Sequence, residues 1–208
     1  MLKTKLIPAE ESGSKHLMIV LHGLGDSMAG YTWVPQAMRC PWLNYLLVNA
    51  PDQYFEGFSW YEYQGNAEPG VCRSIGLLNT LLDAQRADGF PTEQTVLFGF
   101  SQGCLMTLET GLRYPHRLAG LVGLSGYVLD PAKLLNEAAP VAKSQNLLVA
   151  HGRQDPLIPC DKVHEQMKQL RAGVLSLEWH EYDMPHTIIE EEMAVVREFV
   201  KRVSGKGK

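Results

Sequence analysis

Several features that would place this chain in a specialised class of protein are missing. Its 208 residues contain only four cysteines, Cys40, Cys72, Cys104 and Cys160, with no Cys-x-x-Cys pair and no histidine nearby at zinc-ligand spacing. We therefore expect reduced thiols, buried as small apolar residues, and no metal site. No apolar run approaches the ~20 residues that a membrane span needs, and the N-terminus has no apolar signal segment.

An excess of charge of one sign is also missing. The 19 basic and 23 acidic residues give a net charge of -4, and neither kind forms a block. A protein dedicated to nucleic acid carries a basic excess, so we expect no nucleic-acid partner. The 45% of hydrophobic residues is ordinary for a globular protein of one domain. We therefore predict a soluble, cytoplasmic protein without stable membrane insertion, either a monomer or a homodimer.

Short Val/Ile/Leu-rich runs alternate with helical patterns along the chain. The runs predict six strands, at His16–Leu21, Tyr45–Asn49, Thr95–Phe100, Leu118–Leu124, Asn146–Ala150 and Leu175–Tyr182. Apolar residues three and four apart predict helices between them. This alternation is typical of a mostly parallel central sheet with helices on both faces. We predict one α/β domain over residues 1–208, with its core at about 16–203 and a short tail at 204–208.

The segment from Ala50 to Gly70 does not fit this alternation. It is longer than connections in α/β domains usually are, and long connections are often functional. It holds six of the eighteen aromatic residues: Tyr54, Phe55, Phe58, Trp60, Tyr61 and Tyr63. Two interpretations are equally supported, a loop packed over the sheet edge and a wall over an apolar pocket.

A Gly-x-Ser-x-Gly motif at residues 99–103 lies between a predicted strand and a predicted helix. In a nucleophile elbow the chain turns sharply from strand to helix, and the central serine, here Ser101, is held with its hydroxyl exposed. Small residues at Gly99 and Gly103 let the neighbouring backbone segments approach. The alternative, an N-cap serine in an ordinary turn, explains the flanking glycines less well.

A serine hydroxyl needs a base, and the base needs a carboxylate that orients it. In hydrolases with this elbow the chain order is Ser, then Asp or Glu, then His. Asp155 follows the predicted strand at 146–150, and His186 follows the predicted strand at 175–182, so both lie where open α/β sheets place their sites. Asp183 is a rival for the acid, but it lies only three residues before His186. His151 precedes Asp155, so we expect it to be a hydrogen-bonded structural residue.

Two backbone amides are candidates for binding the oxyanion that develops during acyl transfer. One belongs to Gln102, directly after the serine. The other belongs to Leu24, in a glycine-containing loop after the first predicted strand. That loop lacks the spacing of a dinucleotide or phosphate loop.

Together these motifs resemble the small serine hydrolases that group carboxylesterases with lysophospholipases and acyl-protein thioesterases. The matching segments are His22-Gly-Leu-Gly-Asp26, Gly99-Phe-Ser-Gln-Gly103, His151-Gly-Arg-Gln-Asp155-Pro-Leu-Ile-Pro159 and Met184-Pro-His186. The resemblance implies a minimal α/β-hydrolase without a separate cap domain, which cleaves carboxylic esters or thioesters and needs no cofactor. It places Ser101, Asp155 and His186 in the catalytic triad.

The resemblance also bears on the substrate. Trp60 and Tyr61 look like the Trp-aromatic pair of the family, and we expect them to bind substrate together with Leu157, in the turn that faces the aromatic segment. Pro185 stands where the family often has glycine, and Cys104 replaces a small residue behind the elbow. We predict a small-molecule ester of short-to-medium acyl chain as substrate, with thioesters or lysophospholipids as further candidates. The alternatives are a lactone or dienelactone hydrolase, which typically uses cysteine at the elbow, and a catalytically silent binding protein on the same scaffold.

Overall fold

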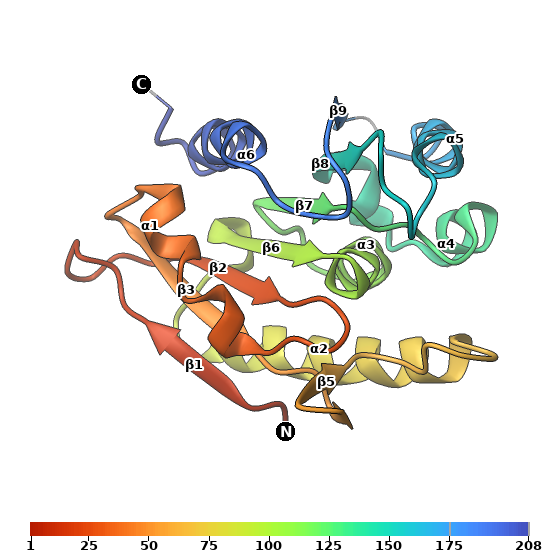
Figure 1. The fold of residues 1–208 in the computed structure, drawn as a ribbon. Coiled ribbons are helices and arrows are strands. Elements are labelled where there is room, and N and C mark those ends of the chain that lie inside the picture. Colours follow the sequence, from red (N-terminus) through yellow and green to blue (C-terminus); the bar gives the residue numbers. More distant parts are fainter. Residues whose placement is uncertain (175, 208) are drawn as a thin grey trace.

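The computed structural model describes residues 1–174 and 176–207, which form a sheet enclosed by helices (Figure 1). The seven-stranded sheet has the order β1-β3-β2-β6-β7-β8-β9, and β1 is antiparallel to β3 while the other neighbours are parallel. Its strands are β1 (Thr4–Ile7), β2 (His16–Leu21), β3 (Leu43–Val48), β6 (Thr95–Phe100), β7 (Gly120–Leu124), β8 (Asn146–Gly152) and β9 (Ser176–Tyr182). A separate hairpin pairs β4 (Asp52–Tyr54) with β5 (Gly57–Ser59).

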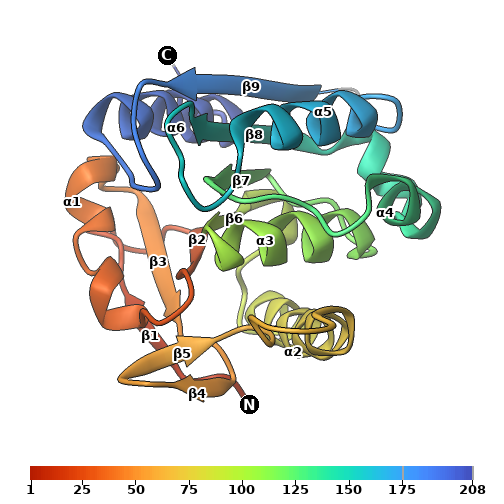
Figure 2. The ribbon, with the colours of Figure 1, turned by 45° about the vertical axis from the view of Figure 1, so that its right-hand side comes forward.

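Helices cover both faces of the sheet. They are α1 (Val34–Met38), α2 (Glu68–Ala87), α3 (Gln102–Arg113), α4 (Pro131–Glu137), α5 (Cys160–Leu170) and α6 (Glu190–Val203). In Figures 1 and 2, α1 and α6 lie on one side of the sheet, and α2 and α3 lie on the other. Among the described residues, no helix is long and apolar enough to cross a bilayer.

Alternate residues of the central strands feed two apolar clusters, one on each face. Leu17, Ile19 and Leu21 of β2 pack with α2, α3 and α5, whereas Met18 and Val20 pack with α1 and α6. A strand buried on both faces has no polar side, which explains why these strands read as continuous apolar runs. The predicted α/β architecture is confirmed.

The predicted strands occur in the structure, with ends that differ by a few residues, and Leu175 lies outside the described residues. Strand β1 was not predicted, because it is short and its residues are mostly exposed. The segment from Ala50 to Gly70 is not a plain connection, since it contains the β4–β5 hairpin and the start of α2. The expectation of buried cysteines was wrong for Cys72, which is exposed on α2.

The turn from β6 to α3 requires glycine for steric reasons. A Cβ atom at Gly99 would overlap the carbonyl oxygen of Gly103, and a Cβ atom at Gly103 would overlap the carbonyl oxygen of Leu21. Backbone atoms cannot give way as the end of a flexible side chain can. Strands β2 and β6 and helix α3 therefore meet at a distance that any larger residue would increase.

We expect Gly103→Ala to lower the free energy of unfolding by about 2 kcal/mol, since the methyl group must displace backbone. Gly76→Ala is the matched control, because Gly76 lies in the exposed middle of α2 and an added Cβ meets nothing within 4 Å. That variant should be more stable by about 1 kcal/mol, from helix propensity alone. Urea denaturation of both variants measures the difference, and equal stabilities would contradict the steric account.

A buried carboxyl group lies in the first turn of α6. Glu192 has no exposed surface, and neither oxygen has a hydrogen-bond partner of normal geometry among the described residues. Burial raises its pKa to about 8, although the nearby backbone N–H of Ile189 lowers it in part. The folded protein therefore binds a proton on Glu192 at neutral pH, which the unfolded chain releases.

This proton makes stability depend on pH. Between the unfolded pKa of 4.5 and the folded pKa of about 8, the native state holds more protons, so the free energy of unfolding falls as pH rises. Glu192→Gln, which keeps the shape of the neutral acid, should remove this loss. We expect the variant to exceed the wild type by on the order of 4 kcal/mol at the alkaline end of this range and to match it below the unfolded pKa. Thermal denaturation across this pH range tests the prediction, and a pH-independent difference would contradict it.

Candidate active site

Ser101 lies at the sharp turn between β6 and α3. Its backbone has φ 55° and ψ -117°, a conformation that is strained for a residue with a side chain. The backbone N–H of Ser101 donates to the carbonyl of Leu124 at the end of β7, at 2.9 Å, which helps to hold this turn. Although Ser101 precedes the helix, its side chain makes no capping hydrogen bond. The hydroxyl is therefore available to other partners.

His186 contacts this hydroxyl, and Asp155 contacts His186 in turn. Nε2 of His186 lies 2.9 Å from Oγ of Ser101, and Nδ1 of His186 lies 2.6 Å from Oδ2 of Asp155. The three residues follow β6, β9 and β8, so they meet at the carboxyl edge of the parallel sheet. A nucleophile, a base and an orienting carboxylate are thus arranged in the order that acyl transfer requires.

The carboxylate of Asp155 is fixed at both oxygens. Its side chain is fully buried, and Oδ1 accepts hydrogen bonds from the backbone N–H groups of Leu157 and Ile158, each at 2.9 Å. Burial raises the pKa of Asp155, but the hydrogen bonds from His186, Ile158 and Leu157 outweigh it, and the net pKa is lowered. Asp155 therefore stays ionised beside the imidazole.

The rival acid lies elsewhere. Asp183 is mostly exposed and pairs with Arg153, whose Nη1 is 3.0 Å from Oδ1 of the aspartate. Arg153 also pairs with Glu181 on β9, at 3.0 Å. Asp183 is thus occupied at the surface, while Asp155 contacts His186.

The amides of Leu24 and Gln102 have no hydrogen-bond partner in the part of the chain that the structure describes. The loop of Leu24 is held against the β4–β5 hairpin, because Gly25 N–H donates to Phe58 O and Phe58 N–H donates to Asp26 O, both at 2.9 Å. Free amides on a fixed loop and at the start of a helix are suited to binding a developing negative charge.

The side chain of Gln102 ties the elbow to the aromatic segment, a role that sequence reasoning missed. Its Oε1 accepts from Trp60 N–H at 3.0 Å and from the hydroxyl of Ser59 at 3.3 Å, and its Nε2 donates to Tyr61 O at 3.1 Å. All of these groups are buried. The motif pointed to the backbone of this residue, but nothing in its pattern indicated where the amide side chain would lie.

A cavity of about 760 Å³ opens over Ser101 and His186. The aromatic segment lines it with Tyr54, Tyr61 and Tyr63, and the turn after β8 lines it with Leu157, Ile158 and Pro159. Tyr61 and Leu157 thus lie where substrate binding was predicted. Both interpretations of the aromatic segment hold in part, since it packs on the fold and also lines a pocket.

The prediction that Trp60 binds substrate must be corrected. It has no exposed surface and does not line the cavity, and its Nε1–H donates to the carbonyl of His22 at 2.9 Å. His22 in turn accepts from the N–H of Ala50 at 3.0 Å, and burial lowers its pKa. Trp60 therefore fixes the backbone at the start of the loop of Leu24, and its ring is not placed to bind substrate in this cavity.

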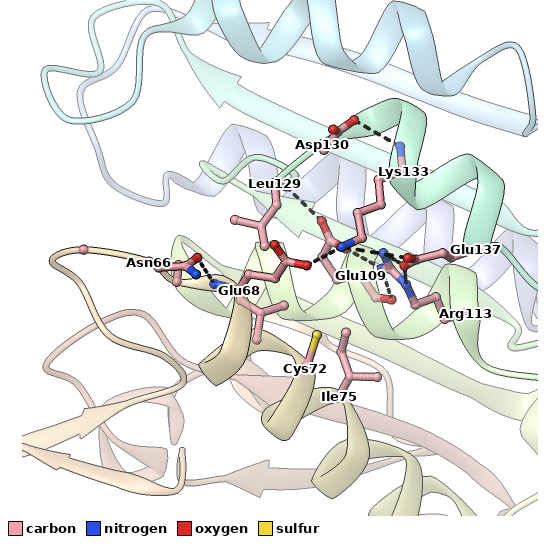
Figure 3. A pocket seen from close by; sticks show the side chains of 13 residues that line it. Asn66, Glu68, Cys72, Ile75, Glu109, Arg113, Leu129, Asp130, Lys133 and Glu137 are labelled. Carbon is pink, nitrogen blue, oxygen red and sulfur yellow. Dashed lines mark hydrogen bonds and ion pairs between the residues drawn. The ribbon is translucent and has the colours of Figure 1, made fainter.

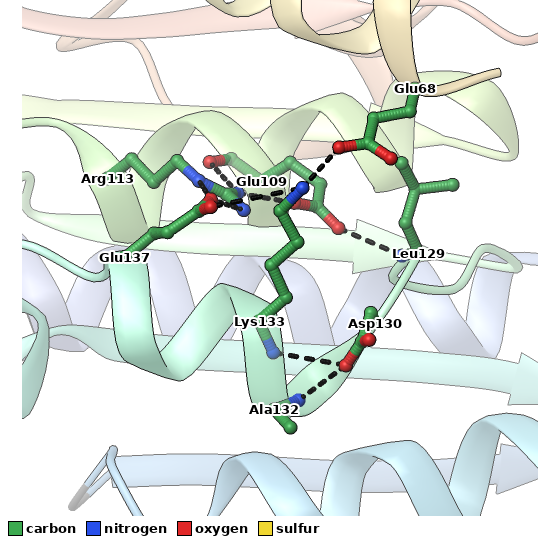
Figure 4. Close-up of polar contacts among 8 residues, drawn as sticks. All are labelled: Glu68, Glu109, Arg113, Leu129, Asp130, Ala132, Lys133 and Glu137. Carbon is green, nitrogen blue, oxygen red and sulfur yellow. Dashed lines mark hydrogen bonds and ion pairs between the residues drawn. The ribbon is translucent and has the colours of Figure 1, made fainter.

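A second cavity, of about 530 Å³, lies between α2 and α4 (Figure 3). Its charged side chains are paired with one another: Lys133 contacts Glu68, and Arg113 contacts Glu109 and, at 2.7 Å, Glu137 (Figure 4). Among the described residues, no serine or histidine lines this cavity. Its ion pairs connect three helices, and the nucleophile and base lie in the first cavity.

Known proteins resemble the chain over nearly its full length. Residues 2–204 match the family described as Phospholipase/Carboxylesterase. Acyl-protein thioesterase 1 of Schizosaccharomyces pombe is 30% identical over 210 residues, which cover 90% of this chain and 91% of that protein. The crystal structure of esterase PE8 superposes with a TM-score of 0.88 at 26% identity, covering 97% of this chain and 99% of its own.

A plant protein gives a similar result. The structure of Arabidopsis thaliana SOBER1 has a TM-score of 0.83 at 25% identity and covers 90% of this chain and 98% of its own. The sequence match and the shared fold lead to the same conclusion. The chain belongs to the phospholipase/carboxylesterase family of α/β-hydrolases.

Proposed function

We propose that this family member carries out its esterase-type hydrolysis through an acyl-enzyme on Ser101. The observation that carries the proposal is the continuous contact from Asp155 through His186 to Ser101, at 2.6 and 2.9 Å. No other histidine contacts the hydroxyl among the described residues.

The reaction has two steps. Oγ of Ser101 attacks the acyl carbonyl carbon while its proton passes to Nε2 of His186, and His186 then gives this proton to the departing alcohol or thiol. Water, deprotonated by the same nitrogen, attacks the acyl-enzyme; the bond between the acyl carbon and Oγ then breaks, His186 returns its proton to Oγ of Ser101, and the acid leaves. Asp155 keeps the imidazole in the required tautomer and stabilises its charged form. The amides of Leu24 and Gln102 stabilise the oxyanion in both steps.

We propose carboxylic esters and thioesters of short-to-medium acyl chain as the substrates. The name of the Schizosaccharomyces pombe relative supports the inclusion of thioesters. The cavity over Ser101 supports a small apolar acyl group, because its walls carry tyrosines and aliphatic side chains. A lactone hydrolase is less well supported, because serine rather than cysteine stands at the elbow. A silent binding protein is disfavoured, because the nucleophile, base and acid are all present and in contact.

Ser101→Ala should lower the turnover of p-nitrophenyl acetate by about a thousandfold or more, since it removes the nucleophile. The matched control is Ser144→Ala, which removes an exposed hydroxyl far along the chain and should keep wild-type turnover. Labelling with a fluorophosphonate probe should be lost only in the first variant. Wild-type turnover in folded Ser101→Ala would reject the mechanism, and an unlabelled wild type would favour the silent binder.

A series of p-nitrophenyl esters from acetate to dodecanoate tests the acyl preference. We expect kcat/KM to be highest for the short and medium members, because charged side chains, among them Asp26, Glu62 and Lys162, interrupt the apolar lining that a longer chain would have to bury against. A matched pair of ester and thioester with the same acyl group, and a lysophospholipid, complete the comparison. A maximum at dodecanoate would contradict the proposed substrate class without affecting the mechanism.

A further inference from the structure

A second histidine lies against the carboxylate of Asp155. His151, near the end of β8, has a fully buried side chain, and its Nε2 is 3.3 Å from Oδ2 of Asp155. The same oxygen is the one that contacts His186. Nε2 of His151 also lies 2.9 Å from the backbone oxygen of Ile158, in the turn that holds Asp155.

These contacts determine the tautomer of His151. Both neighbours of Nε2 are oxygen acceptors, so this nitrogen must carry the hydrogen. Nδ1 is buried and has no hydrogen-bond partner among the described residues, so it has no acceptor for a second proton. Burial lowers the pKa of His151, and the contacts with Ile158 and Asp155 only partly oppose this. The ring is therefore neutral and donates from Nε2 to the carbonyl of Ile158, with the carboxylate of Asp155 beside it.

A stacking contact also restricts the His151 ring. It stacks on Trp179 of β9, with ring centroids 6.2 Å apart and an angle of 21° between the planes. Trp179 donates from Nε1 to Glu181 at 2.8 Å, and its ring stacks on His164 of α5 at 5.1 Å. Because Trp179 is anchored in this way, it limits the rotation that would turn Nε2 away from the carboxylate.

We propose that His151 is a positioning residue for the triad, which acts through Asp155: its Nε2–H donates to the carbonyl of Ile158, in the turn that binds Oδ1, and Nε2 lies 3.3 Å from Oδ2. The inference rests on the proposed function. His186 on Oδ2 and two backbone donors on Oδ1 prevent rotation of the carboxylate, and His151 binds the carbonyl of Ile158, the residue that supplies one of these backbone donors. The N–H dipole of His151 lies beside Oδ2. Its positive end partly offsets the negative charge of Asp155 and so moderates the attraction between Asp155 and a protonated His186.

Other charged groups around His151 lie on neighbouring elements. Glu181 lies opposite it in the sheet register and is paired with Arg153. The remaining charged or titratable neighbours are Asp155 and His186, on the loops after β8 and β9, while His164 of α5 is separated from the ring by Trp179. Because Glu181 and Arg153 offset one another, the carboxylate of Asp155 is the dominant charge that the ring faces.

The pH profile of kcat/KM for p-nitrophenyl acetate separates positioning from a structural role. His151→Leu removes the N–H, so we expect kcat/KM to fall about ten- to hundredfold and the acidic limb to move to higher pH by about half a unit or more. His151→Gln, whose amide nitrogen can occupy the place of Nε2, should keep the limb of the wild type. A structural role alone would lower the rate in His151→Leu and leave the limb in place.

His116→Leu is the control, because it removes an imidazole from the turn after α3, where its partner is Arg86 and not Asp155 or Trp179. We expect its profile to match the wild type. The proposal fails if folded His151→Leu keeps the wild-type limb, or if both leucine variants change in the same way.

Nitrogen-15 NMR of the histidine rings tests the proposal even where His151→Leu does not fold. In the wild-type chain, His151 should be the neutral Nε2–H tautomer across the pH range of activity. An Nδ1–H tautomer, or protonation of this ring in that range, would overturn the proposal. Since this measurement needs no turnover, its outcome is distinct from failure of the proposed function, which Ser101→Ala reports.

Discussion

The site depends on how closely three backbone segments pack at the carboxyl edge of the sheet. Gly99 at the end of β6, Gly103 in α3 and the carbonyl of Leu21 at the end of β2 leave no room for a single Cβ atom. This contact fixes the turn at which Ser101 takes its strained conformation, and it brings the loop of Leu24 beside the elbow. The nucleophile and both candidate oxyanion donors thus depend on one steric constraint.

The acid and the base depend on a different constraint, which is electrostatic. Asp155 is buried, and a buried carboxylate is stable only if donors surround it. The donors come from the backbone of its own turn and from His186. The same hydrogen bonds thus stabilise the buried charge of Asp155 and fix the orientation of the His186 imidazole.

Much of this could be predicted from the sequence, because the relevant patterns are local. Buried parallel strands are continuous apolar runs, and the elbow needs small residues at a fixed spacing around its serine. The order Ser101, Asp155, His186 along the chain then restricted the acid and the base to two loops. Strand β1 and the β4–β5 hairpin could not be predicted, because segments of only three or four residues show no clear alternation and become strands only through pairing.

Side-chain direction was the other source of error. Trp60 and Tyr61 are adjacent and aromatic, yet Trp60 is buried and donates to the carbonyl of His22, whereas Tyr61 lines the cavity. A period of two along the chain predicts opposite faces, but it does not say which face is the pocket. The contact between His151 and Asp155 was equally hidden, because it depends on how the turn after β8 folds back.

The two hydrogen bonds between Phe58 and the loop of Leu24 have a consequence for how this fold can change its preference for substrates. The hairpin carries Tyr54, which lines the cavity, and the loop carries a candidate oxyanion donor. In the proposed mechanism, recognition of the acyl group and stabilisation of charge would therefore share one continuous piece of backbone. A hairpin transplanted from a relative would bring its own register to that loop, so selectivity and rate would be inherited together. Leu157 lies in the turn after β8, which these two hydrogen bonds do not join to the loop of Leu24. Substitutions at Leu157 can therefore change the cavity lining without moving that loop.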